Sequence, residues 1–410
     1  MNLTVIENDP LIRPLVSKIE KKFKNGQYIV SDIIQKEKGL TYQYVDLVME
    51  GGGVLGIALV GYIYALEKAG IRFLSIGGTS AGSIAALMLM AVDDRDQIKS
   101  DKLIEILFGL DIKEFIDGDD DAKDFSLFLG QDDLSKKKIK AIWKGAQVID
   151  NVVNDLGLNP GDTFVSWLEE NLKASGVSTL KDLKHRINYL PDGLQNRTTS
   201  KRVTRLECEL ALVTADITTE TKVVFPEMAP LYWAKPDNVN PALFVRASMS
   251  IPLFFQPFQA SGLTRIPGYK KKWKELAGYE GKIPSKVYFQ DGGIMSNFPI
   301  NLFHVDGVPL APTFGVKLNS SARKYQSIDG PISYLFSMFN SIRHYADFDF
   351  LARNPDYSQL ITYINTEDHN WLNFFMKDKE KLELFRKGVL NGFEFLEQFD
   401  WKKYKKVRGG

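Results

Sequence analysis

The sequence predicts an α/β protein built on a mainly parallel sheet, with helical additions at both ends. The main observation is an order of apolar strand, glycine-rich turn and apolar helix that occurs twice within residues 44–92. A strand–helix–strand unit of this kind normally forms two parallel strands joined by a right-handed crossover. Because no stretch of the 410 residues has the composition of a flexible linker, we expect one large domain with elaborations.

The chain is expected to begin with an accessory segment over residues 1–43. Apolar residues recur on one helical stripe of LIRPLVSKIEKKFK (11–24), and the turn pair Asn25-Gly26 follows that stripe. After Tyr44 the sequence changes to VDLVM, an apolar run typical of a strand that is covered on both faces. We therefore expect the α/β core to occupy residues 44–320.

The following elements of the core alternate between helices and strands. A helix is predicted at 54–68, a strand at FLSI (73–76) and an apolar helix at 81–92. Residues 100–185 have mostly helical patterning, whereas alternating apolar and polar residues predict strands within 203–225.

Two later strands are predicted at KVYFQ (286–290) and TFGVKL (313–318). The patterning of residues 321–410 then predicts a helical C-terminal part, which we expect to pack on the same domain.

Composition excludes several classes of protein. With 52 Lys+Arg against 51 Asp+Glu, the net charge of +1 argues against nucleic-acid binding by bulk electrostatics. The single Cys208 excludes an intramolecular disulfide, and the four histidines are too scattered for a metal motif. The N-terminus lacks the basic start of a signal peptide, and no apolar run reaches about 18 residues. We expect a protein that is cytoplasmic or peripheral to a membrane, with leaderless secretion left open.

The first motif that carries chemistry is GTSAG (78–82), a G-x-S-x-G between an apolar strand and an apolar helix. A serine in this tight turn presents its hydroxyl clear of the main chain, at the positive end of the helix. Gly78 and Gly82 are needed because neighbouring chains crowd the turn. We therefore predict Ser80 as a nucleophile rather than a simple helix cap.

The second motif is GGGVLG (51–56), which admits two interpretations. It satisfies the dinucleotide pattern G-x-G-x-x-G, but that site needs an acidic residue about 20 positions later, and the second strand ends without one. The alternative is an oxyanion hole, since consecutive glycines leave backbone amides free to approach a negatively charged oxygen. Two adjacent parallel strands would place this loop beside Ser80.

The third requirement is a base that removes the proton of the serine hydroxyl. Asp291 ends the strand KVYFQ and precedes Gly292 and Gly293, so a sharp bend can leave its carboxylate at the edge of the sheet. Partial burial would raise the pKa of this carboxylate toward the range in which it works as a base. None of the four histidines has a comparable position at the end of a strand.

Three motifs, VMEGGGVLG (48–56), GGTSAGS (77–83) and QDGG (290–293), occur in the order found in the patatin-like phospholipases, so the sequence resembles that family. Weaker similarity at 156–172, 210–225 and 245–258 extends the resemblance over about residues 45–395. Residues 1–43 lie outside it.

The resemblance implies a three-layer α/β/α fold and a phospholipase A-type carboxylic ester hydrolase. Ser80 is the implied nucleophile and Asp291 the implied base, without a histidine, and the amides of Gly52 and Gly53 are the implied oxyanion donors. The glycines expected to support this site are Gly51, Gly56, Gly78, Gly82, Gly292 and Gly293.

The resemblance also bears on partners. It implies a lipid ester substrate at a membrane or micelle surface, neither metal nor cofactor, and no nucleic acid; a protein activator is left open. One departure from the family is Leu55, where members usually carry Arg or Lys. The missing cation affects the expected substrate and rate rather than the class of reaction.

Two other functions stay open at this point. A Ser–His–Asp esterase could use His304, His344 or His369, in the order Ser, Asp, His along the chain. A lipid-binding or scaffold protein with little catalysis is compatible with the loss of the cation at Leu55.

Overall fold

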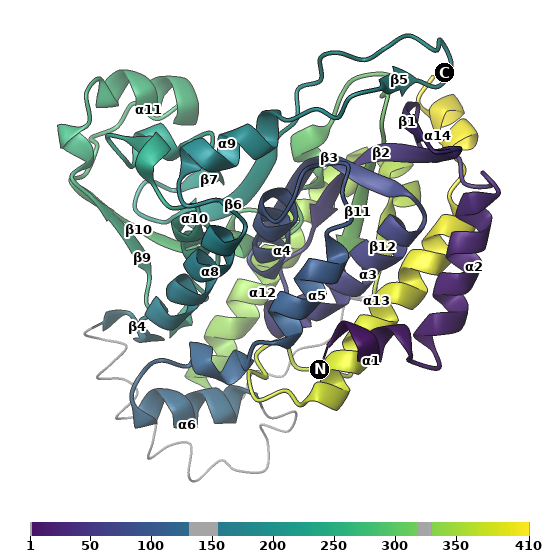
Figure 1. Cartoon of the computed structure of the whole chain (residues 1–410). Helices are drawn as coiled ribbons and strands as arrows, with labels where there is room; N and C mark the ends of the chain where they lie inside the picture. The colour runs from purple at the N-terminus through teal and green to yellow at the C-terminus, as the bar shows by residue number, and fades with distance from the viewer. Residues whose placement is uncertain (1, 131–154, 319–327, 329, 410) are drawn as a thin grey trace.

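The computed structural model describes residues 2–130, 155–318, 328 and 330–409. Its centre is a mixed sheet with the strand order β12-β11-β2-β3-β6-β10-β9 (Figure 1). The five strands from β12 to β6 are parallel, whereas β10 runs antiparallel to both β6 and β9. The strands of this order are β2 (Leu40–Met49), β3 (Ile71–Thr79), β6 (Leu210–Asp216), β9 (Phe258–Ser261), β10 (Lys286–Asp291), β11 (Thr313–Lys317) and β12 (Ile361–Tyr363).

Shorter strands extend the sheet beyond this row. β1 pairs with β2 and with β5, and β7 pairs with β6, while β4 and β8 form a separate two-stranded sheet. The sheet therefore includes part of residues 1–43, whereas the sequence analysis expects this segment to be accessory. These strands are β1 (Ile33–Glu37), β4 (Gly157–Asn159), β5 (Leu194–Asn196), β7 (Thr221–Phe225) and β8 (Leu253–Phe255).

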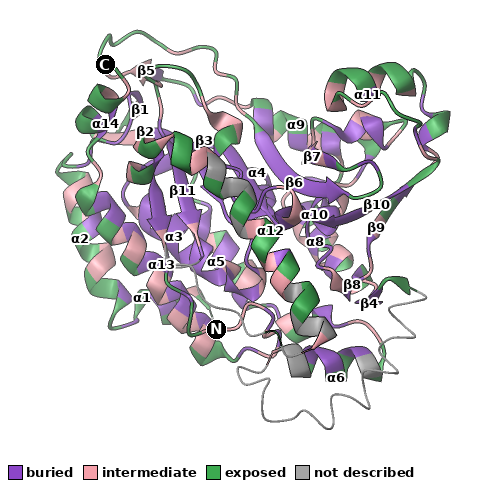
Figure 2. Cartoon of the chain, turned by 180° about the vertical axis from the view of Figure 1, so that it is seen from behind, coloured by how far each residue is buried: buried purple, intermediate pink, exposed green. Residues whose placement is uncertain are grey.

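Helices cover both faces of the sheet (Figures 1 and 2). The strands β2, β3 and β6 step across the sheet in one direction, so right-handed crossovers put α3 and α4 on the same face. β11 and β12 step in the opposite direction, and α12, which connects them, lies on the other face. This arrangement confirms the predicted three-layer α/β/α fold.

The helices include terminal ones at both ends of the chain, as predicted, and within the described ranges none is both long and apolar enough to cross a bilayer. The part of the predicted helical stretch at 131–154 lies outside the described residues. The α-helices are α1 (Leu3–Glu7), α2 (Ile12–Lys24), α3 (Ile57–Lys68), α4 (Ala81–Ala91), α5 (Ser100–Phe108), α6 (Asp120–Leu129), α8 (Asp162–Ala174), α9 (Leu180–Asn188), α10 (Ala242–Ser248), α11 (Tyr269–Ala277), α12 (Pro331–Arg353), α13 (Asp378–Gln398) and α14 (Trp401–Val407).

The two strands at the centre of the sheet are buried along their whole length. Every residue of β3 and of β6 is buried, because helices cover both faces (Figure 2). This burial explains why FLSI lacks the alternation of a half-exposed strand. The ends of these strands consequently lie inside the protein.

One predicted strand region is shorter than its pattern suggests. Residues 203–209 lie outside any strand, and β6 begins only at Leu210. The apolar–polar alternation arises because Leu206 and Cys208 pack against a small separate cluster that includes Tyr44 and Leu74. An irregular segment that lies across such a cluster shows the same period as a strand.

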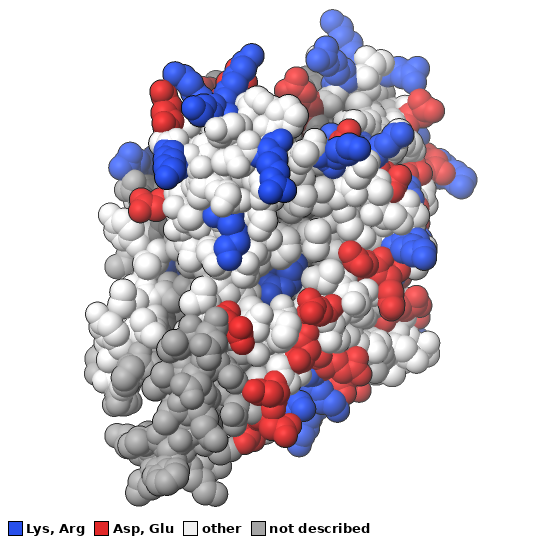
Figure 3. Space-filling view, turned by 90° about the vertical axis from the view of Figure 1, so that its left-hand side faces the viewer, with Lys and Arg blue, Asp and Glu red and all other residues white. Residues whose placement is uncertain are grey.

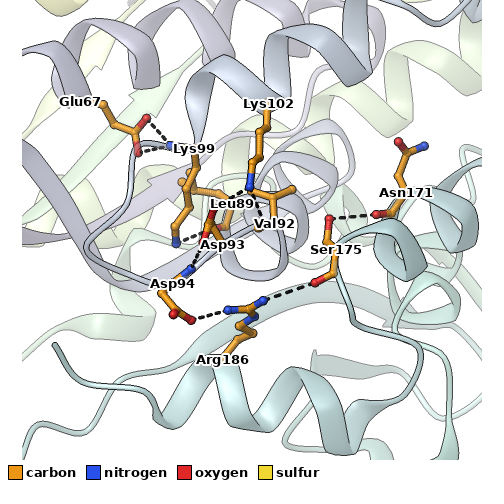
Figure 4. A network of polar contacts seen from close by, with 10 residues as sticks. All are labelled: Glu67, Leu89, Val92, Asp93, Asp94, Lys99, Lys102, Asn171, Ser175 and Arg186. Atoms are coloured by element: carbon orange, nitrogen blue, oxygen red, sulfur yellow. Dashed lines mark hydrogen bonds and ion pairs between the residues drawn. The ribbon is translucent and has the colours of Figure 1, made fainter.

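The C-terminal half of α4 is fixed by charged side chains (Figure 4). The ammonium group of Lys99 donates a 2.8 Å hydrogen bond to the carbonyl of Leu89, and Lys102 donates a longer one to the carbonyl of Val92. The carboxylate of Glu67, on α3, accepts a hydrogen bond from the amide of Lys99. Cations at the C-terminal end of a helix also stabilise its dipole. These contacts therefore hold the C-terminal end of the helix that follows Ser80.

The surface carries charges of both signs, in keeping with the net charge of +1. Viewed from the side of α11, lysines and arginines gather along the top of this face and acidic residues at its lower right (Figure 3). A largely uncharged area lies between them.

The C-terminal helix α13 lies directly against α3. A Cβ atom at Gly388 would be 2.0 Å from the carbonyl oxygen of Ala58, and one at Gly61 would be 2.2 Å from the carbonyl oxygen of Phe385. The two main chains therefore approach so closely that only glycine fits at these positions. This contact joins α13 to the core.

We expect Gly388→Ala to destabilise the protein, although alanine favours helices over glycine by about 1 kcal/mol. The added methyl group would collide with α3, and overpacking of this kind typically costs about 1–3 kcal/mol. Urea unfolding should show a lower midpoint for this variant. Leu390→Ala, at an exposed position of the same helix, should change stability by less than about 0.5 kcal/mol. An unchanged or higher midpoint for Gly388→Ala would contradict the close contact.

Candidate active site

Ser80 occupies a strained turn between β3 and α4. Its φ of 51° and ψ of −120° place it in a conformation that residues with a side chain rarely adopt, at a cost of roughly 1–3 kcal/mol. The turn is held because the Ser80 amide donates a 2.9 Å hydrogen bond to the hydroxyl oxygen of Ser248, which donates to the carbonyl of Val213. The side chain is therefore fixed at the N-terminal end of α4.

The turn after β2 lies directly beside the turn of Ser80. β2 and β3 pair in parallel with Met49 opposite Gly78, so both turns begin at the same level of the sheet. A Cβ at Gly82 would lie 2.3 Å from the carbonyl oxygen of Met49, and one at Gly51 would lie 3.1 Å from the carbonyl oxygen of Thr79. The contact between the turns is thus made by main-chain atoms.

The other predicted motif glycines also meet close neighbours. A Cβ at Gly78 would lie 2.3 Å from the carbonyl oxygen of Gly82, and one at Gly292 would lie 2.1 Å from that of Val213. Gly56 and Gly293 are similarly confined, by Ala81 and by the Asp291 carboxylate. The structure therefore explains why small residues occur at these positions.

The amides of Gly52 and Gly53 lie next to this contact. The residues on either side are anchored, since the Gly51 amide donates to the carbonyl of Asn297 and the Val54 amide to the carbonyl of Trp371. Among the described residues, no acceptor pairs with the amide of Gly52 or of Gly53. These two amides are therefore unpaired within the described part of the chain, and their role as oxyanion donors stays a prediction.

Asp291 approaches Ser80 from a strand of opposite direction. β10 is antiparallel to β6, with Asp291 opposite Thr214, while Thr79 on β3 is opposite Val213 on the other side of β6. The Asp291 carboxyl is thereby at the level of Ser80, and the Ser80 side chain is close enough to lower the pKa of that carboxyl. The structure thus brings together the two residues that the sequence analysis selects as nucleophile and base.

Burial dominates the electrostatics of Asp291. Its side chain is almost completely buried, and this raises the pKa of its carboxyl above the ordinary value. The charge of Arg343 and hydrogen bonds from Ser80 and from the Gly293 amide act in the opposite direction. The net result is a carboxylate that is a stronger base than an exposed aspartate.

A network of polar residues, not identified from the sequence, holds the glycine loop. The Glu50 carboxylate pairs with Lys317 at 2.7 Å and accepts a hydrogen bond from the Leu318 amide. The amide nitrogen of Asn297 donates to Glu50 and to the carbonyl of Gly51, both at 3.2 Å. Glu50 belongs to the motif VMEGGG, so its position directly before the glycines is the signal that could have identified it.

Arg343, on α12, is a further residue that sequence analysis missed. Its guanidinium donates a 2.8 Å hydrogen bond to the carbonyl of Gly51 and lowers the pKa of Asp291. The same group lies 5.0 Å from the ring centre of Trp371. Leu55, by contrast, is buried in the apolar core. The absence of a cation at Leu55 could have prompted a search for one elsewhere in the chain.

The histidines of the described part of the chain contact neither Ser80 nor Asp291. His304 pairs with the Tyr357 hydroxyl at 2.7 Å, whereas His185 is exposed on α9. His369 lies near Asp368 and Glu383. The side chain of His344 lies outside the described residues.

Chemically, the site combines a serine hydroxyl at a helix N-terminus, a buried carboxylate as its partner, and two free amides. This set is suited to attack on a carbonyl carbon and to stabilisation of the resulting oxyanion. Within the described ranges, the only cluster of three potential metal ligands is Asp368, His369 and Glu383, which includes neither Ser80 nor Asp291.

Comparison with known proteins identifies the family of the chain. A family model described as patatin-like phospholipase matches residues 47–304. An uncharacterized protein of Bacillus subtilis (strain 168), YqhO, is 28% identical over 364 residues, which cover 87% of this chain and all of YqhO. Lysophospholipase NTE1 of Debaryomyces hansenii is 41% identical over 68 residues, or 17% of this chain and 4% of that protein.

Two solved structures are more distant. VipD from Legionella pneumophila aligns with a TM-score of 0.42 and 16% identity, covering 93% of this chain and 73% of VipD. ExoU, from the ExoU–SpcU complex of the Pseudomonas aeruginosa type III secretion system, aligns with a TM-score of 0.34 and 17% identity, covering 90% and 57%. At these TM-scores the assignment rests on the family model alone.

Replacing Arg343 with glutamine should raise the pKa of Asp291, because the guanidinium charge favours the carboxylate form. The pH dependence of the reaction of Ser80 with a fluorophosphonate should then have its acid-side inflection about one pH unit higher. Arg343→Lys, which keeps the charge, should shift it less. Arg353→Gln, at an exposed position of the same helix, serves as the control. An inflection that stays in place or moves to lower pH in Arg343→Gln would contradict this electrostatic role.

Proposed function

Because the chain belongs to the patatin-like phospholipase family, we propose that it is a phospholipase A-type lipid acyl hydrolase with Ser80 and Asp291 as its catalytic dyad. Family membership supports lipid hydrolysis in general. The observation that carries the finer proposal is that the Ser80 side chain lies close enough to the buried Asp291 carboxyl to lower its pKa.

In the first half of the proposed reaction, Ser80 is acylated. Asp291 accepts the proton of the Ser80 hydroxyl while the oxygen attacks the carbonyl carbon of the ester. The carbonyl oxygen becomes negatively charged and accepts hydrogen bonds from the amides of Gly52 and Gly53. The ester C–O bond then breaks, and Asp291 returns the proton to the departing alcohol. The fatty acyl group is left on Ser80.

In the second half, water hydrolyses the acyl-enzyme. Asp291 removes a proton from the water molecule as its oxygen attacks the acyl carbon, and the same amides stabilise the second oxyanion. When the bond to Ser80 breaks, its oxygen takes the proton back from Asp291. The products are the free fatty acid and the original hydroxyl.

The raised pKa of Asp291 sets the expected pH dependence. Only the ionised carboxylate can accept a proton, so activity should fall as the pH decreases through its folded-state pKa. Because burial raises this pKa, the decrease should occur at a higher pH than for an ordinary aspartate, whose pKa is about 3.9.

The exposed face of α12 supports a substrate within a lipid surface. Large apolar side chains recur along it at helical spacing: Tyr334, Leu335, Met338, Ile342, Tyr345 and Phe348 are all at least two-fifths exposed. The opposite face of the helix carries Arg343 and the buried Phe339 toward the site. Contiguous exposed apolar surface of this kind marks an interaction site. We therefore propose that the protein acts at the periphery of a membrane, with α12 contacting the acyl chains.

Replacing Ser80 with alanine or Asp291 with asparagine should decrease turnover of phospholipid vesicles at least about a thousandfold. Circular dichroism would check the folding of each variant. Asp216→Asn is a matched control, since Asp216 is also buried with a raised pKa but pairs with Thr218 and Thr219.

The same assay distinguishes the proposed dyad from a Ser–His–Asp esterase and from a lipid-binding protein. His304→Gln, His344→Gln and His369→Gln should each keep activity within a fewfold, whereas a folded histidine variant without turnover would favour a Ser–His–Asp triad. Wild-type Ser80 that does not react with a fluorophosphonate in folded protein would instead favour a lipid-binding protein.

If α12 contacts acyl chains, a charge introduced on its exposed face should impair binding and hydrolysis of lipid in vesicles selectively. Met338→Glu and Tyr345→Glu should decrease vesicle binding and hydrolysis of long-chain lipids at least tenfold, because a charge would have to enter the apolar layer. Turnover of a dissolved short-chain ester should change little. Leu11→Glu, at another exposed apolar position, is the control. Equal losses on both substrates, or none on vesicles, would contradict membrane contact through α12.

A further inference from the structure

Three potential metal ligands meet between α13 and the segment that follows β12. His369 Nε2 lies 3.9 Å from an oxygen of Asp368 and 3.8 Å from an oxygen of Glu383. All three ligand atoms lie within 4.8 Å of one another. Asp368 and His369 come from the segment, and Glu383 from the first half of α13.

The buried imidazole is what distinguishes this cluster from an ordinary group of surface acids. The His369 side chain is only 7% exposed, and within the described part of the chain its Nε2 has no hydrogen-bond partner. A buried ring nitrogen without a partner is unfavourable. Here that nitrogen faces two carboxylates, neither of which is close enough for a hydrogen bond.

The ligand atoms are near the spacing that a single divalent ion needs. Zinc binds imidazole nitrogen at about 2.0–2.1 Å and carboxylate oxygen at about 2.0–2.2 Å in tetrahedral geometry, so two such ligands lie about 3.4 Å apart. The two distances from His369 exceed this spacing by about 0.5 Å. Asp368 and Glu383 are 57% and 45% exposed, so their side chains can adjust and water can complete the coordination.

Lys387 neutralises only one side of the cluster. Its ammonium group pairs with Oδ1 of Asp368, whereas it is Oδ2 that faces His369. The second oxygen therefore keeps lone pairs for an ion while the first is held in place by the lysine.

We propose that Asp368, His369 and Glu383 bind one divalent transition-metal ion of the Zn²⁺ type. The set of one imidazole and two carboxylates favours such an ion over calcium or magnesium, which bind oxygen alone. The ion joins the segment after β12 to α13. Two residues after His369, the carbonyl of Trp371 accepts a 3.1 Å hydrogen bond from the Val54 amide in the glycine loop. The site is therefore structural, and it fixes the segment that packs on that loop.

Calorimetric titration of the full chain, without an affinity tag, with ZnCl₂ tests the proposal directly. We expect one ion per chain and a thermal midpoint that rises with the free Zn²⁺ concentration, because the ion binds the folded protein alone. His369→Gln and Glu383→Gln should each weaken binding at least tenfold and remove the thermal shift. His185→Gln, which removes an exposed histidine of α9, should bind as the wild type does.

Several results would overturn the site. Binding that survives in both His369→Gln and Glu383→Gln, or that is lost in His185→Gln, would place the ion elsewhere. Absence of binding to the wild type would rule the site out. Because the readouts are stoichiometry and thermal midpoint, they do not depend on the proposed hydrolase activity.

Discussion

The site depends on a contact between the main chains of two turns that follow neighbouring parallel strands. At Gly82 and at Gly51 there is no space for a side chain, because each meets atoms of the other turn. The register of β2 and β3 places both turns at one level. The hydroxyl of Ser80 and the amides of Gly52 and Gly53 are consequently positioned by backbone geometry, which preorganises them without the entropy of long side chains.

The groups around this contact have opposing effects on the pKa of Asp291. Burial raises the pKa of Asp291, whereas the charge of Arg343 lowers it, and the same guanidinium holds the carbonyl of Gly51. On the other side of the loop, Glu50 is balanced by Lys317. A buried carboxylate without such partners would be too costly to remain charged. Base strength and loop position are thus set by the same few residues.

The sequence predicts those parts of the site that depend on local pattern. Ser80 and the glycine loop were identified because each follows an apolar strand, and the pairing of β2 with β3 then follows from the crossover rule. The prediction of Asp291 rests on its position at the end of a strand. The antiparallel direction of that strand is not part of the prediction. Arg343 could not be found this way, since its contact with Gly51 depends on how a helix nearly 300 residues later packs.

The other differences between the predicted and the observed structure also arise from long-range packing. Residues 203–209 show strand periodicity because they pack against a small cluster, and pairing partners, which the sequence does not reveal, decide whether a ladder forms. Glu383 and His369 belong to different elements, so their spacing resembles no ligand motif. Local pattern identifies turns and strands, whereas long-range packing assembles the supporting residues around them.

The position of β11 has a consequence for any shortened form of this protein. The family match ends at residue 304, yet β11, which lies between β12 and β2 in the sheet, begins only at Thr313. A truncation at the match boundary would remove the strand that pairs with Asp46–Met49 of β2, and would strip α13 from α3. Such an open edge is a template for aggregation, so the folding unit is larger than the matched region.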